Sequence, residues 1–211
     1  MNRGWLMAHV DRFAGVIFDY GGVLASHQTE EDKRRLATLV GVSEPLFSEL
    51  YWADRAGYDR GDVSATEYWH EIGQKAGKPL TDETIAKIVD CDSRSWMRFN
   101  REMYVFAHGL GRRGIRIAIL SNMPRDLGEA IQADGFGFSG FDPVTLSYEV
   151  RAAKPQAAIY DECLEGIGTK PGKTLFLDDR AENVSAAQAL GIQALQFTFP
   201  EEMLKRLNGT P

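Results

Sequence analysis

Short runs of aliphatic and β-branched residues recur along the chain and predict buried β-strands. They occupy residues 14–18, 115–120, 144–146, 174–177 and 192–197. The last four runs are separated by segments whose apolar residues have helical spacing, and this alternation is typical of a parallel sheet with helical crossovers. The pattern therefore predicts an α/β fold built on a doubly wound parallel sheet.

The gap between the first and second runs has a different pattern. From about residue 28 to residue 100 there is no convincing strand, and apolar residues recur at helical spacing instead. Four helix starts carry a capping residue followed by an acid or a proline: Thr29 with Asp32, Ser43 with Pro45, Ser64 with Glu67, and Thr81 with Asp82 and Glu83. We expect a helical cap at 28–100 after the first strand, a core domain formed by 13–27 and 101–211, and an N-terminal extension at 1–12.

At 211 residues, with 44% hydrophobic and 26% charged residues, the chain has the composition of an ordinary globular protein. The net charge of −6 argues against a general affinity for nucleic acid. The two cysteines, Cys91 and Cys163, lack metal-ligand spacing and indicate a reducing compartment. The first residues contain no apolar run long enough for a signal peptide or a membrane span. We expect a cytoplasmic protein with no nucleic-acid or membrane partner, and the oligomeric state stays open.

One glycine-rich stretch, "GLGRRG" at 109–114, matches the glycine pattern of dinucleotide-binding loops. That pattern binds a pyrophosphate only when it follows a strand and opens a helix. Here the stretch ends a helical segment and precedes the run at 115–120, so the polarity is reversed. We interpret it as a helix end followed by a turn.

Polar residues follow four of the expected strands. They are Asp19 after the first run, Ser121 and Asn122 after the second, Lys154 downstream of the third, and Asp178, Asp179 and Asn183 after the fourth. Because the carboxyl ends of parallel strands share one edge of the sheet, these groups can meet in one crevice. Carboxylates with a lysine and a hydroxyl suit phosphoryl chemistry assisted by Mg²⁺. Oxygen ligands hold the ion, and the ion and the lysine neutralise phosphate charge that would repel an attacking carboxylate.

The motifs "FDYGGVL", "ILSN", "AKP" and "FLDDRAEN" occur in this order between residues 14 and 187. This combination resembles the four motifs of the haloacid dehalogenase (HAD) superfamily, and the inserted helices look like the helical cap of that family. The resemblance implies a Rossmann-like core with a small flap, a mobile cap over the crevice, and Mg²⁺ as cofactor. In the phosphatases of this family, the aspartate of the first motif attacks phosphorus, forms an aspartyl-phosphate and is regenerated by water.

The resemblance also implies a role for each matching residue. Asp19 is then the nucleophile and a metal ligand. Ser121, with the backbone amide of Asn122, holds the phosphoryl oxygens. Lys154 orients the nucleophile and neutralises charge.

At the metal, the resemblance implies Asp179 as a ligand beside Asp19, with Asp178 and Asn183 supporting the site. One position departs from the family pattern. Phosphatases of the family usually carry a second aspartate two residues after the nucleophile, which protonates the leaving group and then activates water. That position is Gly21 here. Its backbone carbonyl can still ligate the metal, but acid–base catalysis worth ~10²–10⁴-fold is missing.

Three functions stay open at this point. The leading one is a Mg²⁺-dependent phosphatase of a small phosphorylated metabolite, favouring good leaving groups such as sugar 1-phosphates, because the "D-x-G" first motif resembles a branch that includes sugar-1-phosphate phosphatases. The second is a metal-independent 2-haloacid dehalogenase. Asp178 and Asp179 argue against it, because without a cation they would raise the pKa of Asp19 and weaken the nucleophile. The third is a weakly active or non-catalytic protein that binds a phosphorylated ligand or a protein partner.

The stretch "YWADRAGYDRGDVSATEYW" at 51–69 mixes aromatic, basic and acidic residues within the expected cap. Most of these residues are expected to pack helices or to face solvent. The candidates to face the crevice and contact the substrate are Tyr51, Trp52, Arg55 and Tyr58. Asp54 and Asp59 are the candidates to supply the missing acid.

Overall fold

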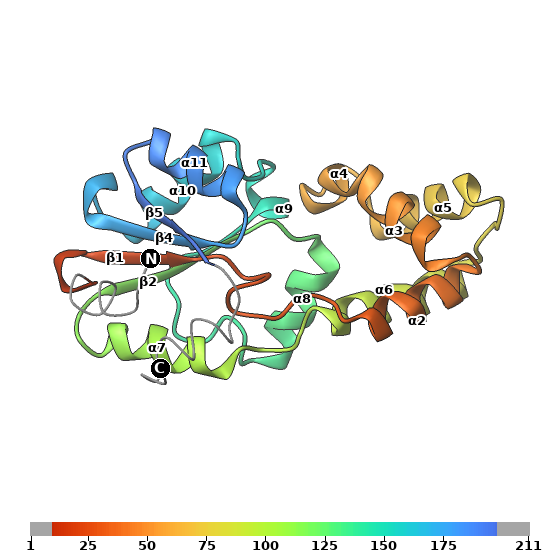
Figure 1. The fold of residues 1–211 in the computed structure, drawn as a ribbon, viewed down its shortest axis with the longest axis horizontal. Helices are drawn as coiled ribbons and strands as arrows, with labels where there is room; N and C mark the ends of the chain where they lie inside the picture. Colours follow the sequence, from red (N-terminus) through yellow and green to blue (C-terminus); the bar gives the residue numbers. More distant parts are fainter. Residues whose placement is uncertain (1–9, 198–211) are drawn as a thin grey trace, which may run out of the picture.

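The computed structural model describes residues 10–197 of the protein. Within this range a five-stranded sheet has the order β3-β2-β1-β4-β5, and each neighbouring pair is parallel. The strands are β1 (Gly15–Phe18), β2 (Arg116–Ser121), β3 (Val144–Leu146), β4 (Thr174–Asp178) and β5 (Gln193–Gln196). Helices cover both faces of the sheet (Figure 1), so the expected doubly wound α/β fold is confirmed.

The helices and 3-10 turns of this sheet-containing lobe alternate with its strands after β2, as the sequence predicts. They are η1 (Val10–Arg12), α7 (Arg101–Gly111), α8 (Arg125–Asp134), α9 (Ser147–Val150), α10 (Ala157–Ile167), η2 (Pro171–Lys173) and α11 (Ala181–Ala189). The "GLGRRG" stretch ends α7 and turns through Gly114, at φ 81°, into β2, which confirms the interpretation as a helix end and turn.

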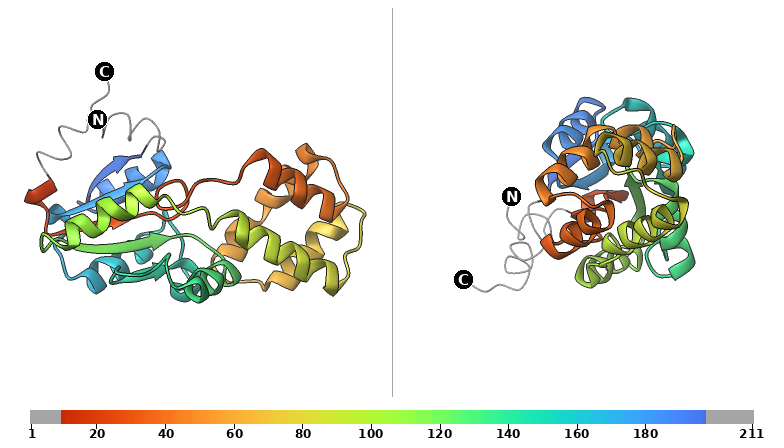
Figure 2. Two further views of the ribbon diagram at one scale, coloured as in Figure 1. Left: turned by 90° about the horizontal axis from the view of Figure 1, so that it is seen from below. Right: turned by 90° about the vertical axis from the view of Figure 1, so that its right-hand side faces the viewer.

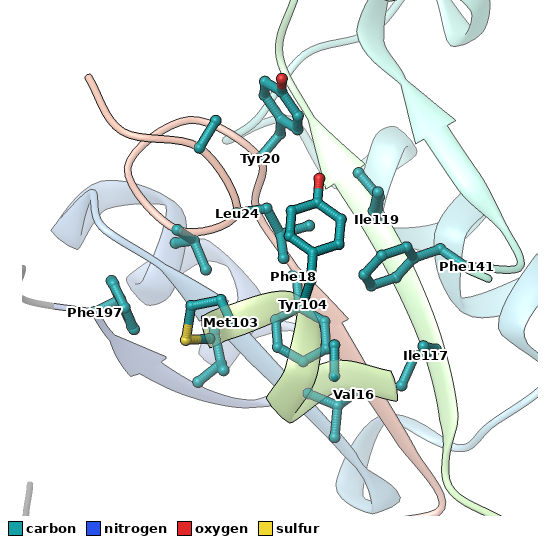
Figure 3. Packing of buried hydrophobic residues seen from close by; sticks show 14 of the residues in the cluster. Val16, Phe18, Tyr20, Leu24, Met103, Tyr104, Ile117, Ile119, Phe141 and Phe197 are labelled. Carbon is teal, nitrogen blue, oxygen red and sulfur yellow. The ribbon is translucent and has the colours of Figure 1, made fainter. Parts of the chain in front are cut away.

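Alternate residues of β1 enter two apolar layers. Val16 and Phe18 face α7 and pack with its Tyr104, as Figure 3 shows. Ile17 faces the other side and joins a cluster that includes Tyr160 of α10. Because both faces of this strand are covered, its sequence is a continuous apolar run without polar alternation.

The register of the sheet brings the ends of β1 and β4 side by side. Phe18 of β1 is level with Leu177 of β4. The next residue, Asp19, donates its backbone N–H to the carbonyl of Leu177 at 2.9 Å. Asp19 and Asp178 therefore emerge together at the carboxyl edge of the sheet, where parallel α/β folds place their ligands.

A second lobe consists of the helices between β1 and α7. They are α2 (Glu30–Val40), α3 (Glu44–Ala53), α4 (Arg55–Asp59), α5 (Ala65–Lys75) and α6 (Asp82–Ser95). These helices surround an apolar cluster of their own that includes Leu36, Phe47, Trp69 and Ile88. Figure 2 shows this helical lobe at one end of the molecule and the sheet at the other.

Capping residues begin these helices where the sequence predicts. Thr29 and Ser64 form full capping boxes, and the Thr81 side chain accepts the backbone N–H of Thr84. Ser43 precedes α3, but its side chain makes no capping hydrogen bond. The short helix α4 was not predicted, because its five residues are too few for a periodic apolar pattern.

The two segments that connect the lobes run beside each other (Figure 2). Ala25 and Phe99 form an antiparallel bridge, and Ser26 donates its backbone N–H to Arg98 at 3.0 Å. Of the N-terminal extension expected at 1–12, only 10–12 lies within the described residues. Among the described helices none is long and apolar enough to cross a membrane.

Candidate active site

Asp19 lies directly after the point where β1 ends. Its carboxylate is buried, with a residue exposure of 6%, and its Oδ1 accepts the backbone N–H of Tyr20 at 2.7 Å. The Lys154 ammonium lies 2.8 Å from the same oxygen. Two donors thus hold one carboxylate oxygen and set the orientation of the group.

Lys154 is held at the site through both its side chain and its backbone. Its Nζ also contacts Oδ2 of Asp178 at 2.7 Å. Its backbone N–H donates to Oδ1 of Asn122 at 2.8 Å, and Nδ2 of Asn122 donates to its carbonyl at 2.9 Å. The resemblance gave a role only to the backbone amide of Asn122, and the structure adds that its side chain positions Lys154.

Asp178 is fully buried and saturated with donors. Nδ2 of Asn183 lies 3.0 Å from both of its oxygens, and the backbone N–H of Arg180 donates to Oδ1 at 2.8 Å. Burial would raise the pKa of Asp178, but the charge and hydrogen bond of Lys154 hold it below its ordinary value. Asp178 therefore stays ionised and anchors the lysine.

The pKa of Asp19 is shifted in the opposite direction to that of Asp178. Burial raises its pKa well above the usual value, the charge of Asp178 raises it further, and Lys154 only partly offsets these effects. Asp179, at the mouth of the site, contacts Nε2 of His27 at 3.0 Å. Ligand oxygens of Asp19, Asp178 and Asp179 lie within 4.8 Å of one another. Three carboxyl groups lie beside one ammonium here, and a bound divalent cation would favour their ionised forms.

Two adjacent glycines in the loop after Asp19 have different conformational needs. Gly22 has φ +76°, and a Cβ there would lie 2.8 Å from Cγ of Asp179, so this position requires glycine. Gly21 has no positive φ, and a Cβ there would lie 3.4 Å from Cζ3 of Trp96. The backbone therefore does not force glycine at the position where the family usually has its acid.

The structure brings the predicted residues together around one cavity of about 350 Å³. Those that line it are Asp19, Gly21, Ser121, Asn122, Lys154, Asp179 and Asn183. Ser121 is almost fully buried at the end of β2, and within residues 10–197 its Oγ makes a single long hydrogen bond, of 3.5 Å to the carbonyl of Asn122. Asp178 is fully buried and does not line the cavity, but it contacts Lys154, which does.

A family model of haloacid dehalogenase-like hydrolases matches residues 13–191. The chain belongs to this family. It is 27% identical over 188 residues to a sesquiterpene phosphatase of Aspergillus oryzae, covering 88% of this chain and 90% of that one. It is 25% identical over 203 residues to a D-ribitol-5-phosphate phosphatase of Bacteroides thetaiotaomicron, covering 86% and 90%.

Solved structures show the same fold. A HAD family enzyme from Bacteroides thetaiotaomicron, in complex with magnesium and inorganic phosphate, superposes with a TM-score of 0.72. The match covers 89% of this chain and 96% of that one at 22% identity. At this level of identity the likeness concerns the fold alone.

The helical lobe of this hydrolase forms the opposite wall of the cavity. Trp52 and Arg55 line it, as expected, whereas Tyr51 and Tyr58 are buried in the lobe and do not. Tyr51 instead donates its hydroxyl to Oδ1 of Asp92 at 2.9 Å. Tyr58 donates to Oδ2 of Asp126, in α8, at 3.0 Å.

The two candidate acids of the helical lobe lie in different places. Asp54 pairs with Lys75 at 2.6 Å on the surface and does not line the cavity. Asp59 does line it, and Oδ1 of Asp59 accepts Nε of Arg55 at 2.7 Å. Burial raises the pKa of Asp59, and Arg55 opposes that rise. Arg55 also lies 3.3 Å from Asp92, so two carboxylates balance its charge.

Six further residues line the cavity that the sequence did not single out. They are Tyr20, His27, Trp96, Met123, Leu127 and Arg180. Tyr20 and Arg180 lie inside two of the motifs, and Met123 directly follows a third, so position in or next to a motif could have indicated them. His27, Trp96 and Leu127 carry no spacing that marks them, and they reach the cavity only through the packing of the two lobes.

Proposed function

We propose that this hydrolase is a Mg²⁺-dependent phosphatase that releases phosphate from a small phosphorylated metabolite through an aspartyl-phosphate on Asp19. The observation that carries the proposal is the arrangement of Lys154 between Asp19 and Asp178, near Asp179, with Asp19, Lys154 and Asp179 lining one cavity. The two curated relatives, which are named as phosphatases of phosphorylated organic molecules, support it.

The residues present suit a magnesium ion. Carboxylate and carbonyl oxygens are the ligands that Mg²⁺ prefers, and we propose that Asp19, Asp179 and the Gly21 carbonyl hold it. Asp178 and Asn183 would support the site. Oδ1 of Asn183 is buried and has no hydrogen-bond partner among the described residues, which fits a site built for a further group. When bound, Mg²⁺ would supply positive charge that offsets the charge of the phosphoryl group.

Each side chain of the site would then have its own role in the reaction. The carboxylate of Asp19 attacks phosphorus, the bond from phosphorus to the leaving oxygen breaks, and water later hydrolyses the aspartyl-phosphate. Lys154 and the Tyr20 N–H keep Oδ1 of Asp19 in a fixed orientation before attack. Ser121 and the backbone N–H of Asn122 would hold the phosphoryl oxygens as charge builds on them.

The absence of an acid at Gly21 narrows the range of substrates that the enzyme can hydrolyse. Without that donor, the leaving oxygen must depart on the strength of its own stability as an anion. We therefore propose that the enzyme favours good leaving groups, of which the anomeric oxygen of a sugar 1-phosphate is one example.

The helical lobe at 28–100 would act as a cap over a core formed by 13–27 and 101–197; residues 198–211 of the expected core lie outside the described residues. Hydrogen bonds across this boundary support the assignment. Tyr58 donates to Asp126, and Ser147 of α9 donates its hydroxyl to the carbonyl of Asp59. Arg151 likewise donates to the carbonyl of Gly61.

We also propose a cytoplasmic setting for this activity and no nucleic-acid partner. Cys91 and Cys163 are both free thiols, which suits a reducing compartment. The net charge of −6 disfavours nucleic acid as a partner. The proposed partner is therefore the small phosphorylated substrate itself.

Phosphate release from acetyl phosphate, with Mg²⁺ and with EDTA, tests the proposal. We expect release that depends on Mg²⁺ and that EDTA abolishes. Release of chloride from 2-chloropropionate in EDTA would instead identify a dehalogenase. Binding of phosphate without turnover of any ester would identify a non-catalytic member of the family.

A further inference from the structure

Apolar side chains from both lobes line the cavity beside the polar motif residues. Trp52 and Trp96 come from the helical side, and Met123 and Leu127 come from the sheet side. Trp52 is 52% exposed although it is a large apolar residue, and its ring packs edge-on against Tyr51 at 4.8 Å between centroids. Trp52 therefore offers exposed indole surface to the cavity, and an apolar group of a ligand could be buried against it.

The indole of Trp96 presents carbon to the cavity because its polar atom is engaged elsewhere. Nε1 of Trp96 donates to the hydroxyl of Tyr51 at 3.2 Å. The Tyr20 hydroxyl donates to the Trp96 carbonyl at 3.0 Å. The Trp96 ring also lies against Gly21, since a Cβ at that position would be 3.4 Å from Cζ3. The ring therefore lies beside the position where phosphatases of the family usually carry the acid that protonates the leaving group.

The charged side chains of this region are already engaged by other protein groups. Arg55 is balanced by Asp59 and Asp92. His27 contacts Asp179, and Arg180 pairs with Glu182. A substrate rich in hydroxyls would have to compete for these groups, and each hydroxyl left buried without a partner would weaken binding. An apolar group meets no such penalty.

We infer that the organic group of the substrate is apolar, and that Trp52 and Trp96 bind it through their ring faces. The inference rests on the proposed phosphatase function and narrows it. Among esters with good leaving groups, it favours those with an aromatic or hydrocarbon group over the anomeric phosphate of a sugar.

The test compares kcat/KM for phenyl phosphate, 2-naphthyl phosphate, glucose 1-phosphate and acetyl phosphate in Mg²⁺. We expect 2-naphthyl phosphate to exceed phenyl phosphate, because its second ring adds apolar area to bury. In Trp52→Ala, we expect the ratio of the 2-naphthyl to the acetyl phosphate value to fall about tenfold, which corresponds to about 1.4 kcal/mol. Trp52→Phe keeps a ring and should recover part of that ratio.

Leu46→Ala is the matched control, because Leu46 is also an exposed apolar residue of α3 but does not line the cavity. It should keep the wild-type ratio. A higher kcat/KM for glucose 1-phosphate than for 2-naphthyl phosphate, or an unchanged ratio in Trp52→Ala, would overturn the apolar inference and leave the phosphatase intact. If none of the four compounds were hydrolysed, acetyl phosphate included, the phosphatase proposal would be overturned together with this inference.

Discussion

The ammonium of Lys154 lies 2.8 Å from Oδ1 of Asp19 in a place where both side chains are almost completely buried. Burial alone would lower the pKa of Lys154, but Asp19 and Asp178 raise it above the ordinary value. The lysine is therefore charged at neutral pH. Its position beside the expected nucleophile makes it the fixed positive charge of the site.

Replacing this lysine should impair chemistry even when the metal is saturating. We expect Lys154→Met to lower kcat by about 10²–10³-fold at saturating Mg²⁺, because a preorganised charge is lost that the ion does not replace. Lys173→Met, at an exposed lysine, is the control and should match wild type. A kcat within about twofold of wild type, about 0.4 kcal/mol in the barrier, would show that Lys154 is not part of the machinery.

The nucleophile can be tested with a change that keeps its size. In Asp19→Asn, an amide oxygen can still accept hydrogen bonds from Lys154 and from the Tyr20 N–H, so the fold and the melting temperature should be close to wild type. We expect turnover to fall by about 10⁴-fold or more, because an amide neither attacks phosphorus nor supplies an anionic ligand. Steady-state phosphate release and circular dichroism measure the two expectations. Appreciable turnover by this variant would rule out the covalent mechanism.

Replacing Asp179 should change the affinity of the enzyme for Mg²⁺. We expect Asp179→Asn to weaken the apparent Mg²⁺ affinity by at least about tenfold, with activity partly restored at high Mg²⁺. The comparison is a Mg²⁺ titration of activity, with Glu182→Gln as the control because that exposed acid lies nearby without joining the carboxylate cluster. Superimposable titrations for wild type and Asp179→Asn would remove Asp179 from the metal site.

The missing acid at Gly21 should appear in the dependence of rate on the leaving group. Across a series of aryl phosphates of similar size, we expect log kcat/KM to rise steeply as the leaving alcohol becomes more acidic. Simple alkyl phosphates should be the poorest substrates. A flat profile, with chemistry shown to limit the rate, would mean that a proton donor lies elsewhere. Asp59 would then be the first group to replace, because it lines the cavity, and Asp59→Asn should make the profile steep.

Restoring an acid provides the converse test. We expect Gly21→Asp to flatten the leaving-group dependence and to help poor leaving groups most, by up to ~10²–10⁴-fold. The backbone at Gly21 accepts a side chain without a positive φ, and the nearest atom to a new Cβ is an edge carbon of Trp96 at 3.4 Å. Gly21→Ala is the control, because it adds the same Cβ contact without the carboxyl. If both variants behaved alike, the gain or loss would come from the Trp96 contact and not from proton transfer.

Patterns over a few neighbouring residues of the sequence predicted most of the fold. The apolar run before Asp19 is buried on both faces, and that burial is why its continuous hydrophobic pattern predicts a strand inside a parallel sheet. Thr29 and Ser64 bond to residues only three positions away, so the sequence alone could place those helix starts. The site on the sheet edge followed from the same logic, because each motif residue stands at a strand end or shortly beyond it.

The cavity wall that faces this edge could not be predicted from the sequence. Arg55 contacts Asp92, 37 positions away, and Trp96 lies over Gly21, 75 positions away, and neither pair has a spacing that marks it. The sequence alone determined a buried parallel sheet with acids and a lysine at its carboxyl edge, because strand burial and helix capping act over a few neighbouring residues. Only the tertiary structure decided that Trp52, Asp59 and Trp96 reach the cavity while Tyr51 and Tyr58 do not. That choice depends on how two separately formed lobes pack across their linkers, and contacts between distant residues leave no periodic trace in the chain.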